Sequence, residues 1–149
     1  MVAYWKRIAP PGRLPGRQHV EPLDIPRLLP KIWLLDVIPA PDSPLVWHFR
    51  YRLAGTMMVE GFGCDPTGRL LHEAWPNIAL PQGTYHQYVD LVEKARISFR
   101  RGQPIFKGNQ DYRWLERILL PLARDGERVD MVLALSTYFS RPPTADSFR

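Results

Sequence analysis

The sequence is poor in cysteine and has no long apolar run. Cys64 is the only cysteine among 149 residues, which excludes an internal disulfide and a metal site built on several thiolates. No apolar stretch approaches the roughly 20 residues of a membrane span. Lys6 and Arg7 interrupt the first residues, where a signal peptide would need an apolar core. We therefore expect a cytoplasmic protein without a membrane segment.

The common catalytic motifs are also missing. The sequence has no Gly-x-Ser-x-Gly, no phosphate-binding glycine loop and no cysteine–histidine pair in a recognisable context. His19, His48 and His72 have no partners at the spacing of metal ligands. We therefore expect neither an enzyme nor a metal site.

Positive charge is in excess but is not clustered. Twenty Lys and Arg residues against 15 Asp and Glu give a net charge of +5. A nucleic-acid-binding domain would gather such charge on one face, whereas these arginines are scattered along the chain. The Arg100-Arg101 pair falls at a predicted helix end, where positive charge suits the helix dipole. We expect no nucleic-acid partner.

An aromatic strand and the turn-rich run after it form the central feature of the sequence. Alternation with a period of two predicts a strand with one buried face, made of Trp47, Phe49, Tyr51 and Leu53. The strand stops at Gly55, and Thr56 is expected to cap a short helix from Met57 to Glu60 through its hydroxyl. We predict that these short helical pieces, and another from Leu70 to Trp75, fold back over the aromatic face as a lid.

A capping box formed by Thr84 and Gln87 predicts the longest helix, with an apolar stripe that continues to Phe99 and a stop at Gly102. The other predicted strands are residues 32–38, 103–106, 112–122 and 129–139, the last two joined by a hairpin turn at residues 124–127. Strands separated by a helical block favour an α+β fold: a five-stranded antiparallel sheet with the helices on one face. We divide the chain into an N-terminal helix with a proline-rich lead-in (1–30), the sheet domain (31–140) and a loose tail (141–149).

Several short motifs occur in an order that resembles a known family. They are Tyr4-Trp5, Asp24-Ile25-Pro26, Leu34-Leu35-Asp36-Val37, Phe49-Arg50-Tyr51-Arg52-Leu53-Ala54-Gly55-Thr56, Gly63-Cys64-Asp65-Pro66-Thr67-Gly68-Arg69 and Leu120-Pro121-Leu122. Together they resemble a bacterial branch of the PAS superfamily, small proteins that are little more than a PAS domain. The resemblance covers Tyr4 to about Tyr138. It implies a sensor or interaction module with a cavity between the sheet and the helices.

The resemblance does not identify a cofactor. Flavin-binding PAS domains carry a reactive cysteine just after Gly-Arg-Asn, but here Leu71 stands at that position and Cys64 lies upstream. Haem-binding PAS domains use a histidine on the long helix, and His86 lies in its first turn, off the apolar stripe. We expect neither flavin adduct chemistry nor haem, and the cofactor is unknown.

The predicted pocket lies between the sheet and the helices and is lined by Trp47, Phe49, Tyr51, Met58, Phe62, Tyr88 and Trp114. Glu116 shares a strand face with Trp114. If that face points inward, the carboxylate needs a partner in an apolar site. If it points outward, Arg113 and Arg117 point inward, which is harder to accept, and a bulge near Leu115 is a third option. We favour a glutamate paired at the edge of the core.

The last strand is apolar on both faces, so both need cover. One cover is the lid and the long helix, and the other is a short amphipathic N-terminal helix from the same chain or from a partner. We predict a homodimer with an interface that includes Tyr4, Trp5, Ile8, Val132 and Ala134.

The sequence supports two functions. The first is a PAS-type sensory or regulatory module that binds a small apolar molecule and signals to an output protein in trans, because no output domain is recognisable. The alternative is an interaction or dimerisation adaptor with a filled core and no ligand. Aromatic side chains on the strand serve equally well as core and as pocket lining.

Overall fold

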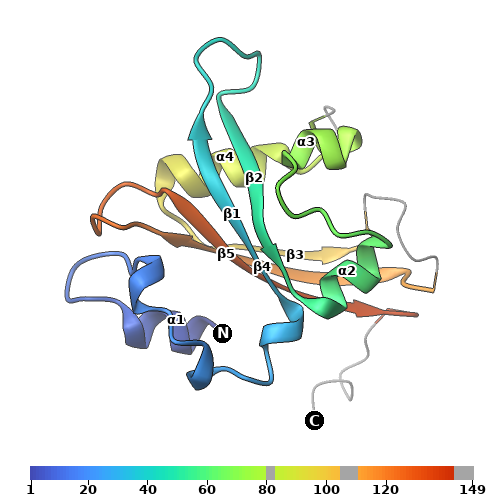
Figure 1. Cartoon of the computed structure of the whole chain (residues 1–149), viewed down its shortest axis with the longest axis horizontal. Coiled ribbons are helices and arrows are strands. Elements are labelled where there is room, and N and C mark those ends of the chain that lie inside the picture. Colours follow the sequence, from blue (N-terminus) through green and yellow to red (C-terminus); the bar gives the residue numbers. More distant parts are fainter. Residues whose placement is uncertain (80–82, 105–110, 143–149) are drawn as a thin grey trace.

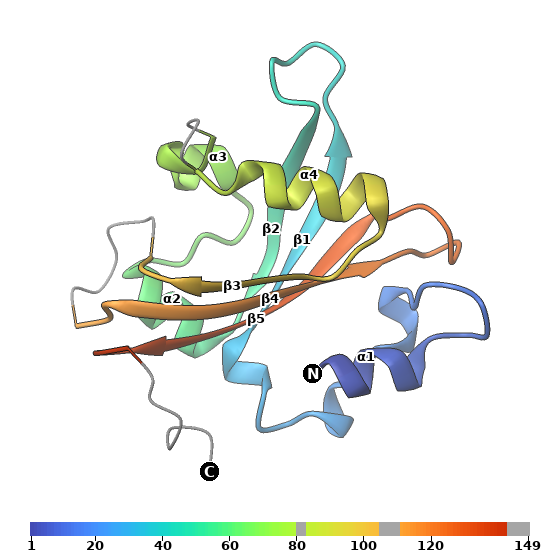
Figure 2. The same cartoon turned by 180° about the vertical axis from the view of Figure 1, so that it is seen from behind.

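Five strands form one antiparallel sheet, as predicted (Figure 1). The structure is a computed structural model that describes residues 1–79, 83–104 and 111–142. The strands are β1 (Ile32–Pro39), β2 (Trp47–Ala54), β3 (Ser98–Gly102), β4 (Trp114–Leu122) and β5 (Met131–Phe139), in the spatial order β2-β1-β5-β4-β3. The sheet twists so strongly that β1 and β2 run across the direction of the other three strands (Figures 1 and 2).

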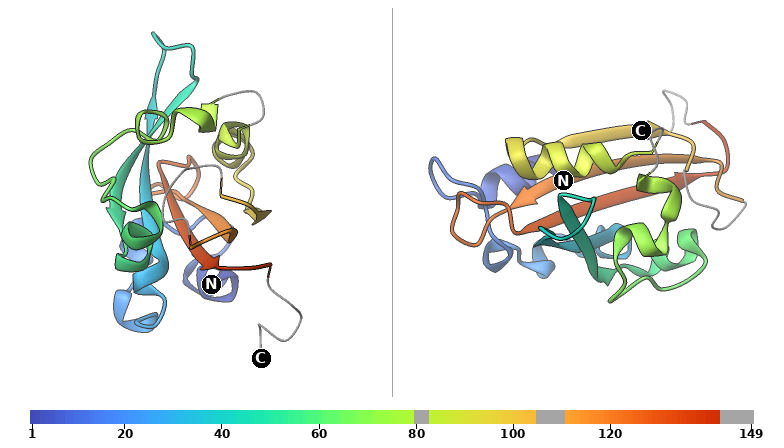
Figure 3. Two further views of the ribbon diagram at one scale, coloured as in Figure 1. Left: turned by 90° about the vertical axis from the view of Figure 1, so that its right-hand side faces the viewer. Right: turned by 90° about the horizontal axis from the view of Figure 1, so that it is seen from above.

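The helices divide between the two faces of this sheet. The inner face carries α2 (Thr56–Phe62), α3 (Leu71–Ala74), η4 (Pro76–Ala79) and α4 (Tyr85–Lys94); we call residues 56–79 the lid. The outer face carries α1 (Val2–Ile8), η1 (Arg17–His19), η2 (Pro22–Asp24) and η3 (Leu29–Lys31). The N-terminal segment thus lies away from α3 (Figure 3, left). Sheet and helices form the α+β architecture expected for a PAS-like fold.

Two predicted helix caps and one predicted helix end differ from the structure. Thr56 lies inside α2, whose N-cap is Gly55, and it does not cap the helix. Thr84 is the N-cap of α4 but makes no capping hydrogen bond. The same helix ends at Lys94, where Ala95 adopts a left-handed conformation, and β3 begins at Ser98. The strand predicted at residues 103–106 therefore comes earlier in the chain, and residues 105 and 106, like 143–149 of the predicted loose tail, lie outside the described residues.

Gly55 is set against the turn that precedes β1. Its backbone N–H donates to the Ile32 carbonyl oxygen at 2.7 Å. A methyl group at this position would overlap the carbonyl oxygens of Leu29 and Pro30. The start of α2 and the η3 turn therefore touch backbone to backbone, which requires glycine.

The outer face of β5 is not the one predicted. Val132 and Ala134 belong to the inner layer, beneath the lid and α4. The outward side chains are Met131, Leu133 and Leu135, because side chains alternate across a strand. The expectation that Val132 and Ala134 face a partner subunit is wrong, although the expectation that both faces of β5 are apolar is correct.

The N-terminal segment of the same chain covers this outer face. Tyr4 is buried, and its hydroxyl both accepts from Glu21 N at 2.8 Å and donates to Glu21 O at 3.2 Å. Trp5 donates from its indole nitrogen to the Pro121 carbonyl oxygen at 2.9 Å, and Ile8 packs on the same cluster. Cover from its own chain was one of the two predicted options, and these contacts hold α1 on β4 and β5.

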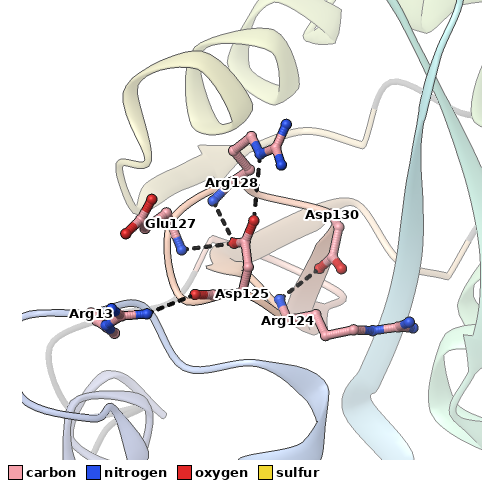
Figure 4. Close-up of polar contacts among 6 residues, drawn as sticks. All are labelled: Arg13, Arg124, Asp125, Glu127, Arg128 and Asp130. Atoms are coloured by element: carbon pink, nitrogen blue, oxygen red, sulfur yellow. Dashed lines mark hydrogen bonds and ion pairs between the residues drawn. The ribbon is translucent and has the colours of Figure 1, made fainter.

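The β4–β5 hairpin fastens the lead-in to the sheet (Figure 4). Asp125 closes the turn by accepting from Glu127 N at 2.9 Å and Arg128 N at 2.8 Å. Arg13 donates to the Asp125 carbonyl oxygen at 3.1 Å, and Leu14 N donates to Gly126 O at 2.9 Å. The predicted turn at residues 124–127 thus doubles as a docking point for residues 13–15.

The outer layer should behave as a second core. Leu133 is 1% exposed in the outer layer, so Leu133→Ala should lower the free energy of unfolding by about 2–5 kcal/mol, measured by urea denaturation. Leu119→Ala in the inner layer should cost a similar amount, whereas Leu23→Ala, at a side chain that is 84% exposed, should cost little. A loss below about 1 kcal/mol for Leu133→Ala would contradict a packed outer layer.

Candidate functional site

A small cavity lies inside the inner layer, between the sheet and the helices. Its volume is about 30 Å³, above the roughly 10–15 Å³ that one water needs and far below the roughly 300–1,000 Å³ of pockets for drug-sized ligands. The residues that line this inner cavity are Trp33, Tyr51, Met58, Phe62, Trp75, Ile78, Tyr88, Arg100, Leu115, Arg117, Ser136 and Tyr138. Most of its wall is aromatic or aliphatic.

The register of β4 places an arginine in this apolar interior. Leu115 and Leu119 belong to the inner layer, so Arg117 between them points inward and is only 5% exposed. Glu116 lies on the opposite face, where Arg101 Nη2 pairs with its carboxylate at 2.6 Å. The glutamate is paired as predicted, but on the outer face, so the preferred inward orientation of the Trp114 and Glu116 face is wrong.

Arg117 is held by two neutral side chains from α4. Its Nη1 donates to the Tyr88 hydroxyl at 2.7 Å, and its Nη2 donates to the Gln87 amide oxygen. The guanidinium also lies 4.9 Å from the centre of the Tyr88 ring. These contacts explain why Gln87 does not complete the predicted capping box: its side chain binds the arginine instead. Arg117 Nε is buried and has no hydrogen-bond partner among the described residues.

A second cation and several hydroxyl groups surround Arg117. Arg100 on β3 lines the same cavity, and desolvation followed by the charge of Arg117 lowers the pKa of its guanidinium. Burial raises the pKa of the Tyr51 and Tyr88 phenols, so both hydroxyls are neutral at physiological pH. Ser136 accepts from the Trp33 indole at 3.0 Å. The cavity thus combines positive charge with neutral polar groups.

The predicted pocket residues divide into three groups. Tyr51, Met58, Phe62 and Tyr88 line the cavity. Phe49 is buried beside them and Trp47 packs partly buried at the margin of the inner layer. Trp114 shares the outward face of β4 with Glu116, so its assignment to the pocket is wrong.

Leu53 also leaves the predicted inner face. The pairing of β1 with β2 shifts between Leu34 and Leu35, so Arg52 is an extra residue in β2. Leu53 then pairs with Leu34 of the outer face and is 46% exposed. Alternation alone holds as far as Tyr51, and no residue type in the sequence marks this bulge.

Several lining residues were not predicted from the sequence. Trp33, Ser136 and Tyr138 follow from the alternation of β1 and β5 once the inward faces are known. An inward Arg117 was one of the alternatives considered for β4, but it was not preferred because a charged side chain usually faces solvent.

The lid and α4 are both held to β2 by polar contacts of aromatic side chains. Trp75 donates from its indole nitrogen to the Tyr51 hydroxyl at 3.0 Å. Tyr85 of α4 accepts from Trp47 N at 3.0 Å and donates to Trp47 O at 2.7 Å. At the outer end of β2, the rings of His48 and His72 lie 4.9 Å apart.

Other candidate groups do not assemble into a site. Cys64 is exposed on the connection after α2, and His86 is exposed on α4. Across residues 1–79, 83–104 and 111–142, no three His, Cys, Asp or Glu side chains are placed to hold a metal ion. Within the same ranges, no helix has the length and apolarity to cross a membrane.

Comparison with known proteins gives one family. The family described as PAS domain matches residues 1–136, which is most of the chain and includes the N-terminal segment. No curated protein matches the sequence.

The histidine pair predicts a pH dependence of stability. Burial, and then the nearby His48, lower the pKa of His72, and Glu73 opposes them only in part. The unfolded chain therefore binds this proton more tightly than the folded one, so the free energy of unfolding should fall as pH drops through and below about 6.5.

His72→Gln should flatten this part of the profile in urea unfolding between pH 8 and 5. His86→Gln, at an exposed position of α4, is the matched control and should leave the profile unchanged. An unchanged pH slope in His72→Gln would refute the assignment.

Proposed function

Because the chain belongs to the PAS domain family, we propose that it is a sensory or regulatory module that binds a small molecule in the inner cavity and passes the signal to a partner protein in trans. PAS domains are generally sensory or binding modules. We further propose that the protein is cytoplasmic, is not an enzyme and does not bind nucleic acid, in keeping with its scattered charge and its lack of catalytic motifs.

The observation that carries this proposal is residual space beside a buried charge. Closely packed protein interiors leave few voids, and a buried cation normally has an anionic partner. Here the inner cavity of about 30 Å³ adjoins Arg117, and the described residues give that side chain only neutral partners. A bound molecule would fill the space and interact with the charge.

The lining also has the balance of a ligand site. Small-molecule pockets are mostly apolar, with a few polar groups that fix orientation. Met58, Phe62, Ile78 and Leu115 supply apolar walls. The guanidinium of Arg117 and the surrounding hydroxyl groups supply the polar part.

A second candidate is an interaction adaptor with a filled core. Its support is the tight packing of the inner layer, where Phe49, Tyr51, Met58 and Tyr88 are each at most 2% exposed. In this case the cavity holds only water, and the function lies on the surface.

An apolar groove on the outer side supports a partner surface. The groove has a volume of about 590 Å³ and lies between the lead-in and the sheet, bordered by Pro22, Pro26, Leu29, Leu34 and Leu53. Strand β2 is an edge of the sheet, but the backbone of Tyr51 is paired there with Gly68 and Arg69, so the support for a partner is the groove itself. We propose that a second copy of the chain occupies this groove, which gives a homodimer.

Native mass spectrometry of protein purified from its own host tests the function. A sensor should retain a small molecule that adds mass to the folded protein and is lost on denaturation. A folded protein with the bare polypeptide mass, recovered under conditions that preserve weak complexes, would favour the adaptor and contradict the sensor.

The homodimer has its own test. Leu53→Asp places a charge in the groove and should shift the protein from dimer to monomer in sedimentation equilibrium at micromolar concentration, because burying an unpaired carboxylate is costly. Val46→Asp, at a side chain that is 57% exposed outside the groove, is the control and should remain dimeric. A wild-type protein that sediments as a monomer would end the dimer proposal.

A further inference from the structure

We propose that the molecule bound in the inner cavity carries a carboxylate, which binds the free Nε edge of Arg117, and a short aliphatic remainder that packs on the apolar wall. This inference rests on the proposed function and names the chemical class of the ligand. It follows from charge, hydrogen bonding and size at the cavity.

The first step is the charge of Arg117. Arg117 is only 5% exposed, and guanidinium groups stay protonated in proteins. A buried charge is costly unless it is paired. Among the described residues that line the cavity, none is acidic. A bound anion in the cavity would supply the partner that the described lining residues do not.

The second step is the Arg117 nitrogen that has no hydrogen-bond partner. Tyr88 and Gln87 each accept one hydrogen bond from the two terminal nitrogens. Nε has no partner among the described residues although it is buried. A guanidinium binds a planar carboxylate through two parallel hydrogen bonds, and Nε with a neighbouring terminal nitrogen still offers such a pair.

The third step is the second cation. Arg100 lines the same cavity, while its Nη2 donates to the Gln103 carbonyl oxygen at 2.7 Å. Two positive side chains that face one interior space repel each other. An anion between the two guanidinium groups would attract both and offset their repulsion.

The fourth step is size and polarity, which separate a carboxylate from a phosphate. A cavity of about 30 Å³ holds only a few heavy atoms. Met58, Phe62 and Ile78 form an apolar wall on which a short aliphatic tail can pack, and which cannot bond further anionic oxygens, so the polar contacts are confined to the side of Arg117 and the hydroxyl groups. A monoanion with two oxygens and a short apolar tail fits this combination better than a tetrahedral dianion.

The experiment measures thermal unfolding of the purified chain in titrations with sodium acetate, propionate and butyrate. Chloride is adjusted to keep the ionic strength constant, and acetamide, propionamide and butyramide are the neutral controls of the same shape. We expect a saturable rise of the unfolding temperature with the carboxylates and none with the amides. An equal response to inorganic phosphate at matched ionic strength would overturn the choice of carboxylate.

Variants at Arg117 test whether the carboxylate binds to this side chain. Arg117→Met keeps the volume and removes the charge, and should weaken carboxylate binding about 10- to 100-fold, as expected for hydrogen bonds to a charged group. Arg117→Lys keeps the charge but loses the planar pair of donors, so it should bind more weakly than wild type. Arg113→Met, at an exposed position just before the same strand, is the matched control and should bind as wild type does.

A direct readout covers the case in which Arg117→Met does not fold. The Nε–H resonance of Arg117, assigned by its absence in Arg117→Lys, should shift on carboxylate addition to the wild-type protein. An Nε–H resonance that does not move at saturating carboxylate, or an Arg117→Met protein that responds as wild type does, would overturn the inference.

Failure of this inference can be told apart from failure of the proposed function. A neutral molecule retained in the native mass spectrum, together with no response to carboxylates, refutes the carboxylate and leaves the sensor intact. No retained molecule and no response to any small molecule, charged or neutral, refutes both.

Discussion

The apolar character of β5 on both faces is the constraint from which the architecture follows. Its inward side chains need the lid and α4, and its outward side chains need a second cover, because an apolar sheet face exposed to water is unfavourable. The N-terminal segment supplies that second cover through Tyr4 and Trp5, and the hairpin turn at Asp125 holds the lead-in in place. The protein is therefore a three-layer structure in which residues far apart in the sequence depend on one strand.

The buried guanidinium of Arg117 places a positive charge in the otherwise largely apolar inner layer. It joins the first half of α4 to β4 through Tyr88 and Gln87, so one polar group fixes the helix on the sheet. Buried ionic groups seldom contribute net stability, which makes a purely structural reason for this arginine weak. Its position beside unfilled space is the reason why the proposed ligand site is built around this residue.

Much of this arrangement could be read from the sequence, and the exceptions have physical causes. Alternation predicted the inward faces of Phe49 and Tyr51, and a doubly apolar last strand predicted two covers. Alternation failed at Leu53, because a bulge at Arg52 changes the register without any marker in the residue types. In β4 the alternation itself holds, but the wrong face was taken as inward for Arg117 and Trp114, because the general rule that charges face solvent decided the choice. Gln87 was expected as a cap, and only the folded structure shows that its side chain serves a residue 30 positions away.

The contact at Gly55 has a mechanical consequence. Gly55, the N-cap of α2, lies directly against the backbone of Leu29 and Pro30. The lid and the lead-in therefore contact each other at the edge of the sheet. A molecule that displaces α2 would therefore act on the η3 turn as well. Leu29 and Pro30 of that turn also line the outer groove. The contact at Gly55 joins the inner and outer layers at the edge of the sheet, outside the strands that lie between them.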